Sequence, residues 1–133
     1  MVRRAAADQD ARFERSTLMD VSLRLIILGW TFTGLLLVLV VICIAAARGA
    51  LPLNGFVGIR IPSLMRNDAA WRAGHAAAVR PATVAFVVAL IASGIGLALP
   101  PAYWGAIGAF AAGVVWVFIR SSRAARSVPA SSG

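Results

Sequence analysis

The sequence has no lysine, one cysteine, one histidine and only five acidic residues among its 133 positions. With a single cysteine no disulfide can form within the chain, and Cys43 is expected to be a small buried apolar residue without a redox role. No Cys/His cluster offers metal ligands, and no Gly-rich loop followed by Lys-Ser or Lys-Thr offers a nucleotide site. The lone His75 has no Ser or Cys nucleophile near it in the sequence. We therefore expect no catalytic residues, no metal and no cofactor, in a protein that is not an enzyme.

Charge is scarce as well, and it is absent from three long stretches. Charged residues make up 14% of the chain and hydrophobic residues 60%, and the mean hydropathy is +0.84. Residues 25–47, 81–99 and 102–119 contain no Asp, Glu, His, Lys or Arg. Each can cross a hydrocarbon core of roughly 30 Å at about 1.5 Å per helical residue, and lipid requires the backbone hydrogen bonds of a span to close within it. The sequence predicts an all-α integral membrane protein with three transmembrane helices. Because ion-coupled transporters usually carry a titratable side chain within the membrane, it also argues against a transporter.

The stretches without charge divide the chain into parts of different character. A polar leader covers residues 1–24, a membrane domain covers 25–119, and a loop covers 48–80 between the first two spans. The tail, residues 120–133, is small and polar, and we expect it to be disordered past its first turn. Pro81 suits the first position of the second helix, where its missing N–H costs nothing.

The distribution of arginine predicts the orientation of the chain. Three spans place the loop and the tail on one side, and the leader and the short 100–101 connection on the other. The loop and tail carry eight arginines and the leader carries five, together with four acidic residues. The eight are Arg48, Arg60, Arg66, Arg72, Arg80, Arg120, Arg123 and Arg126. Because cytoplasmic segments are enriched in positive residues, we expect a multi-pass protein of the cell membrane with loop 48–80 and the C-terminus in the cytoplasm.

The same arginines also indicate what the protein contacts. They flank the ends of the expected helices, where anionic headgroups of membrane lipids lie. No basic stripe interleaved with aromatic residues occurs outside the membrane segments. Membrane lipids are therefore expected partners, and nucleic acid is not.

Small residues recur at every fourth position of the second and third spans. They are Ala85, Ala89 and Ser93 on the second, and Gly105, Ala109 and Gly113 on the third. Lipid supplies little hydrophobic drive for helix association, so small residues that let backbones approach closely mark the contact faces. We expect these two stripes to face each other as a packing surface.

The loop contains most of the side chains capable of specific recognition. Asn54, Gly58 and Arg60 can form a tight turn, because Gly permits positive φ, Asn can cap backbone groups, and Arg60 would project from the turn. An ordinary interfacial turn with a snorkelling arginine is an equally good interpretation. Asn67 then caps a short interfacial helix over 69–79. It places Trp71 and His75 on one face, although such a helix can also serve only to anchor the loop.

At these residues the chain resembles a known family. The pattern is Asn54-x-x-x-Gly58-Ile59-Arg60-x-Pro62, then Asn67-Asp68-x-x-Trp71-x-x-x-His75, preceded by one membrane helix and followed by two. It resembles the SdpI family of bacterial membrane proteins, named for an immunity protein against a secreted sporulation-delaying toxin, over roughly residues 25–119. The resemblance implies a plasma-membrane protein linked to toxin immunity and, in some members, to signal transduction by sequestering a cytoplasmic regulator.

Two hypotheses about function follow. In the first, the 54–75 loop recognises a toxin peptide or a cytoplasmic regulator, with Asn54, Gly58, Arg60, Trp71 and His75 forming the recognition element. In the second, the chain is a small accessory subunit of a larger membrane complex and packs against a membrane-protein partner through its small-residue stripes.

Overall fold

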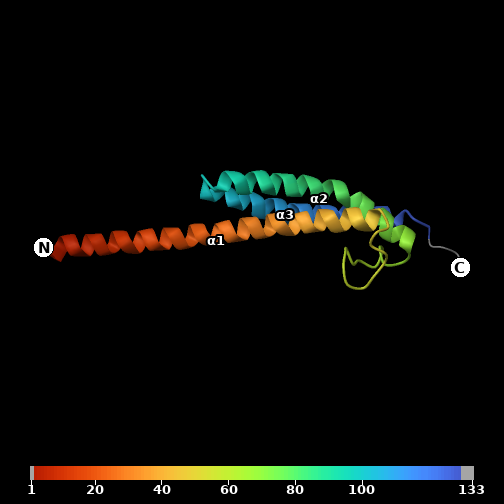
Figure 1. The fold of residues 1–133 in the computed structure, drawn as a ribbon, viewed down its shortest axis with the longest axis horizontal. Coiled ribbons are helices and arrows are strands. Elements are labelled where there is room, and N and C mark those ends of the chain that lie inside the picture. The colour runs from red at the N-terminus through yellow and green to blue at the C-terminus, as the bar shows by residue number, and fades with distance from the viewer. Residues whose placement is uncertain (1, 130–133) are drawn as a thin grey trace.

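The chain folds as a bundle of three long helices, seen in a computed structural model that describes residues 2–129 (Figure 1). The elements are α1 (Val2–Ala47), α2 (Asp68–Gly96), the short 3₁₀ helix η1 (Pro100–Ala102) and α3 (Tyr103–Arg126), and the described residues contain no strand. Each of the helices α1, α2 and α3 has the length and the apolar composition needed to cross a membrane. The expected all-α architecture with three membrane-spanning helices is therefore confirmed.

The second and third helices form an antiparallel hairpin joined at η1, and α1 lies alongside both (Figure 1). Residues 48–67 lie at the same end of the bundle as the end of α3, and we call this the loop end. The opposite end, at η1, is the hairpin end. The first helix continues well past the hairpin end, so its first half has no neighbouring helix (Figure 1).

The polar leader and the first span form one continuous helix. The division at residues 24 and 25 rests on charge alone, and α1 runs through it from Val2 to Ala47. The reason is local: no proline occurs before residue 52 and no glycine before residue 29. The hydroxyls of Ser16 and Thr17 also bond back to the carbonyl of Phe13 within the helix.

The expected interfacial helix over 69–79 is not a separate element either. It is the first part of α2, which passes through Pro81 and ends at Gly96, short of the expected residue 99. Asn67 caps its start as predicted, because its Oδ1 accepts from the N–H of Ala70 at 2.8 Å. Pro81 is buried within the helix, between the buried Ala78 and Ala82, so tertiary packing on both sides holds the axis across the proline.

The third helix continues beyond its expected end at residue 119. It reaches Arg126, so the first seven residues of the expected tail are helical, and residues 130–133 lie outside the described chain. At the other end of the hairpin, Leu99 leaves the helix with φ −129° and ψ 87°. Its conformation is extended because the residue before a proline is disfavoured in the α region.

Near the hairpin end the bundle is held together by Tyr103. This ring is fully buried against Gly29 of α1 and Gly96 of α2, and a Cβ at either glycine would overlap it. Beside it, the Thr33 hydroxyl donates to the carbonyl of Gly29, so the 2.9 Å bond between Thr33 and Ser93 has the Ser93 hydroxyl as its donor. This buried bond joins α1 to α2.

In the middle of the bundle the α2–α3 contact follows small residues. Gly113 lies directly against the Cβ of Ala85. Ala106 is fully buried, Ala109 is half-buried, and Gly105 is exposed with Ala92 as its neighbour. Of the two glycines, Gly113 therefore lies closer to the neighbouring helix than Gly105 does.

Candidate functional site: a loop held by Trp71 and His75

The loop begins where α1 is terminated by a glycine. Gly49 has φ +78°, a conformation that L side chains rarely adopt, and its N–H donates to the carbonyl of Ala46 at 3.1 Å. The N–H of Leu51 donates to the carbonyl of Ala45 at 3.2 Å. These bonds satisfy carbonyls at the end of α1 and direct the chain back across the bundle. Sequence reasoning missed Gly49, although a glycine directly after the last helical turn is its usual signal.

Asn54 organises the tip of the loop. Its Oδ1 accepts from the N–H groups of Phe56 at 2.9 Å and Val57 at 2.8 Å, and its Nδ2 donates to the carbonyl of Pro52 at 2.8 Å. The side chain thus caps backbone groups on both sides of the turn, as the sequence indicates. Phe56, at the tip, is 91% exposed.

Gly58 follows with φ +113°, again in the region that favours glycine. A Cβ at this position would lie 2.7 Å from the indole Cη2 of Trp71 and 2.9 Å from Nε2 of His75. Both the backbone conformation and the lack of space therefore require glycine here. The expected Gly58 turn is present, and it lies on the two aromatic side chains of α2.

The imidazole of His75 connects the loop to α2 through two hydrogen bonds. Its Nε2 accepts from the N–H of Ile59 at 3.0 Å, and its Nδ1 lies 2.9 Å from the carbonyl of Trp71. A ring nitrogen that accepts from an N–H carries no proton, so His75 is neutral with its proton on Nδ1, which donates to Trp71. The ring is fully buried, and the described residues contain no group of three potential metal ligands. His75 acts here as a hydrogen-bond acceptor for the loop backbone.

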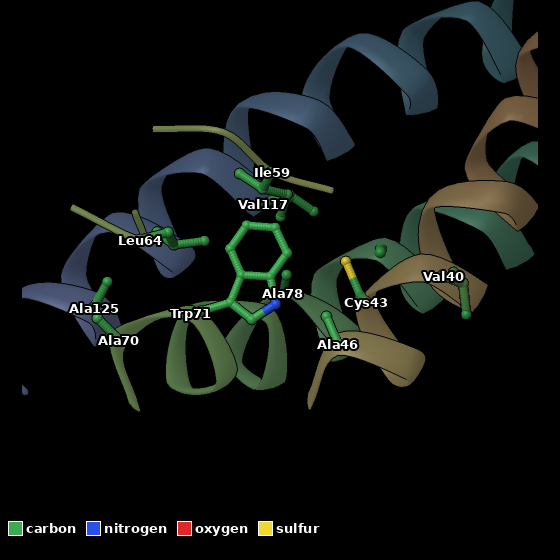
Figure 2. Packing of buried hydrophobic residues seen from close by; sticks show 11 residues of the cluster. Val40, Cys43, Ala46, Ile59, Leu64, Ala70, Trp71, Ala78, Val117 and Ala125 are labelled. Atoms are coloured by element: carbon green, nitrogen blue, oxygen red, sulfur yellow. The ribbon is translucent and has the colours of Figure 1, made fainter. Parts of the chain in front are cut away.

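The Trp71 ring fills the space beneath the loop. It is 1% exposed, its Nε1 donates to the carbonyl of Leu51 at 3.0 Å, and its ring centroid lies 4.2 Å from that of His75. Figure 2 shows the indole beneath Ile59 of the loop and Val117 of α3, with Cys43 of α1 nearby. This single side chain therefore joins the loop to all three helices. Cys43 is buried, as expected.

Leu64 secures the second half of the loop. Its side chain is fully buried and lies where a Cβ of Gly74 would be, within 2.9 Å of that position. Gly74 thus lets the loop approach the α2 backbone, one residue before His75. The sequence pattern did not identify this pair.

Arg66 joins the loop to the end of α3, a contact that the sequence did not predict. Its guanidinium Nη2 donates to the carbonyls of Ala125 at 2.6 Å and Val128 at 3.1 Å, and its Nε donates to the carbonyl of Ser63 at 3.3 Å. It thereby satisfies carbonyls at the end of α3 and fastens that end to the loop. No local pattern could reveal a contact between residues so far apart in the sequence.

Arg60 differs from the other four candidate residues because its side chain is exposed. It forms the rim of a cavity of about 430 Å³ between the loop, α1 and α3. The walls are apolar and include Leu35 and Leu39 of α1, and Phe110 and Val114 of α3. The described part of the chain provides no hydrogen bond or ion pair to the Arg60 guanidinium. The site is thus an apolar groove with one free positive charge at its edge.

The expected packing residues lie elsewhere. Gly105, Ala109 and Gly113 belong to the α2–α3 contact and lie outside this groove. Asn54, Gly58, Trp71 and His75 build the loop from within, and Arg60 alone presents a charged group outward.

Comparison with known proteins places this loop in a family. Residues 50–121 match the model of the SdpI/YfhL protein family, a range that includes all five candidate residues, all of α2 and most of α3. No curated protein and no solved structure matches the chain. The matched range is 72 of the 133 residues, more than half of the chain. The chain therefore belongs to the SdpI/YfhL family, as a membrane protein with three helices suited to spanning the bilayer.

Proposed function

We propose that this protein is a non-enzymatic recognition protein of the bacterial cell membrane, of the SdpI immunity and signal-transduction type. It binds a toxin peptide or a regulatory partner through the loop of residues 54–75. The observation that carries the proposal is the position of Arg60, an exposed guanidinium at the edge of an apolar groove of about 430 Å³.

Of the five candidate residues, four support the structure of the loop, and Arg60 is available to contact a partner. Asn54 and Gly58 shape the turn, and His75 holds the next backbone N–H of the loop. The exposed Asn54 cap and the buried Ile59–His75 bond together hold the backbone at Arg60 in one conformation, so little backbone conformational entropy is lost when a partner binds. Recognition then rests on Arg60 together with the groove.

The chemistry of the site indicates the kind of partner. An arginine fork binds a carboxylate in a bidentate manner, and the apolar walls suit leucine-like or aromatic side chains. The partner is therefore an apolar peptide segment with an acidic residue or a C-terminal carboxylate at one end. The exposed Phe56 at the loop tip extends the apolar surface.

We further propose that the loop end faces the cytoplasm. The arginines at that end outnumber those of the leader, eight to five, and Asp68 is the single acidic residue in the loop and tail. A cytoplasmic regulator can reach Arg60 directly in this orientation, and a membrane-embedded toxin peptide can reach it along the groove. A reporter fused after Gly133 that is active only outside the cell would contradict this orientation.

A photo-crosslinker placed at residue 56 tests the proposal in cells. Arg60→Ala should abolish the discrete crosslinked product while leaving the membrane level of the protein unchanged. Arg72→Ala is the matched control, because Arg72 is an exposed loop-end arginine outside the groove. A product that is equally strong in both variants would refute a role for Arg60 in recognition.

A second candidate function is an accessory subunit of a larger membrane complex, and one observation favours it. The half of α1 beyond the hairpin end has no neighbouring helix and carries exposed apolar residues such as Phe13, Leu18 and Leu23. A stoichiometric partner that co-purifies in mild detergent and survives Arg60→Ala would favour this function over the first.

A further inference from the structure

A second cavity at the loop end lies on a different surface, between α2 and α3. Its volume is about 310 Å³, and it is lined by Arg80, Pro81 and Val84 of α2 and by Trp116 and Arg120 of α3. Both arginines are exposed, and neither has a hydrogen bond or an ion pair with any described residue. Two guanidinium groups from adjacent helices therefore share one cavity with an aromatic wall.

Within the described part of the chain, no acidic side chain is placed to neutralise this pair. Four of the five acidic residues fall within the first twenty positions, toward the far end of α1. The fifth, Asp68, precedes Arg80 by twelve residues on the same helix, a separation of about 18 Å along the axis. No acidic side chain that the structure describes therefore supplies the anion that would balance Arg80 and Arg120.

The cavity does not end at the arginines. An adjoining cavity of about 210 Å³ shares Val84 and Trp116 with the 310 Å³ cavity and extends along the helices to Val88 and Ala112. Arg80, Val84 and Val88 are spaced four residues apart on α2, and Arg120, Trp116 and Ala112 mirror them on α3. The result is an apolar groove about 12 Å long that runs from the two charges toward the middle of the bundle.

We propose that Arg80 and Arg120 bind the phosphate group of an anionic phospholipid whose acyl chain lies in this groove. Guanidinium groups form charge-assisted hydrogen bonds to phosphate oxygens, and the tryptophan ring is suited to the headgroup level. The apolar groove selects a lipid over a free phosphate ion, since a free ion would make no use of it. This site is separate from the Arg60 groove, which lies between α1 and α3, and the inference goes beyond the proposed function.

Native mass spectrometry of the delipidated full chain in mild detergent tests the site, with phosphatidylglycerol as the titrated lipid. The double variant Arg80→Gln, Arg120→Gln is expected to bind about thirtyfold more weakly than the wild type, from two arginines at a charged lipid surface. The control Arg123→Gln, Arg126→Gln removes the same charge from the same end of the bundle, outside this cavity. It is expected to bind as the wild type does. Equal weakening in the two double variants would overturn the site, because net charge alone would then explain binding.

Two further experiments distinguish binding of a lipid from binding of free phosphate, and loss of the groove from misfolding of the protein. Millimolar inorganic phosphate should not displace phosphatidylglycerol, and displacement by it would overturn the lipid assignment. Ala112→Leu narrows the groove without changing charge and should weaken lipid binding severalfold, whereas Ala111→Leu, on an exposed face of α3, should not. If both leucine variants bind as the wild type does, the acyl chain does not occupy the groove and the proposal fails.

Discussion

The backbone N–H of Ile59 donates a 3.0 Å hydrogen bond to Nε2 of His75, one turn after Trp71 on α2. Both groups are buried, so neither can exchange its partner for water without moving. The conformation of the loop that carries Arg60 therefore depends on an imidazole that itself never reaches the surface.

Two substitutions of His75 distinguish the effect of its hydrogen bond to the loop from the effect of its side-chain volume. His75→Ala leaves the Ile59 N–H buried without a partner and should lower the free energy of unfolding by about 2 to 3 kcal/mol. His75→Gln keeps a side-chain oxygen near the position of Nε2 and should recover part of that loss. Denaturant unfolding in detergent, followed by circular dichroism, measures both, and equal losses in the two variants would show that the hydrogen bond contributes nothing.

Gly58 and Gly55 form a matched pair in the same loop. Gly58→Ala forces a Cβ against Trp71 at a φ of +113°, and it should destabilise the protein by at least about 2 kcal/mol. A Cβ added at Gly55 would meet no atom within 4 Å, so Gly55→Ala should change stability by less than about 0.5 kcal/mol. Limited proteolysis of the loop and thermal unfolding both report the difference. Similar behaviour of the two variants would contradict the close approach of Gly58 to the aromatic pair.

Gly113 and Gly108 offer the same comparison within α3. Gly113→Ala places a methyl group against Ala85 and should cost about 1 to 3 kcal/mol by separating α2 from α3. Gly108 has open space around it, so Gly108→Ala should be neutral or slightly stabilising. Unfolding in mixed micelles of increasing denaturing-detergent content gives the measurement. A stable Gly113→Ala variant would mean that the two helices are not in close contact at this position.

Arg66→Ala should loosen the end of α3 without unfolding the bundle. Loss of the guanidinium bonds to Ala125 and Val128 should raise hydrogen exchange over residues 122–128, corresponding to a local loss of about 1.5 to 3 kcal/mol. Arg126→Ala removes a neighbouring exposed arginine and should leave that exchange almost unchanged. If exchange rises equally in both variants, the bonds of Arg66 do not hold the helix end.

The residues of the proposed recognition element could be identified from the sequence, but the different structural role of each could not. Asn54 and Gly58 could be assigned to a turn because capping amides and glycines act within a few residues of the chain. The spacing of Trp71 and His75 placed them on one helix face. What spacing could not show is that this face lies against Gly58, leaving Arg60 alone at an open groove.

Helix boundaries show a similar limit. Pro81 was expected to start a helix, yet α2 passes through it because buried neighbours on both sides hold the axis. Tyr103 and Trp104 begin α3, where aromatic residues favour the membrane interface, yet the Tyr103 ring is buried on Gly29 and Gly96 while Trp104 is 63% exposed. In both cases packing between segments distant in the sequence overrode a sound local preference.

The sequence by itself determined that the chain is helical and that three segments are suited to crossing a membrane. It also determined that most of the side chains capable of specific recognition lie in one loop. These properties follow from apolar runs and local hydrogen-bonding capacity, which neighbouring residues decide. Only the tertiary structure decided that His75 is a neutral acceptor for Ile59 and that Arg66 caps α3. It also decided that Arg80 and Arg120 share a cavity. Each of these relationships joins residues on different elements, and their geometry exists only once the helices have packed.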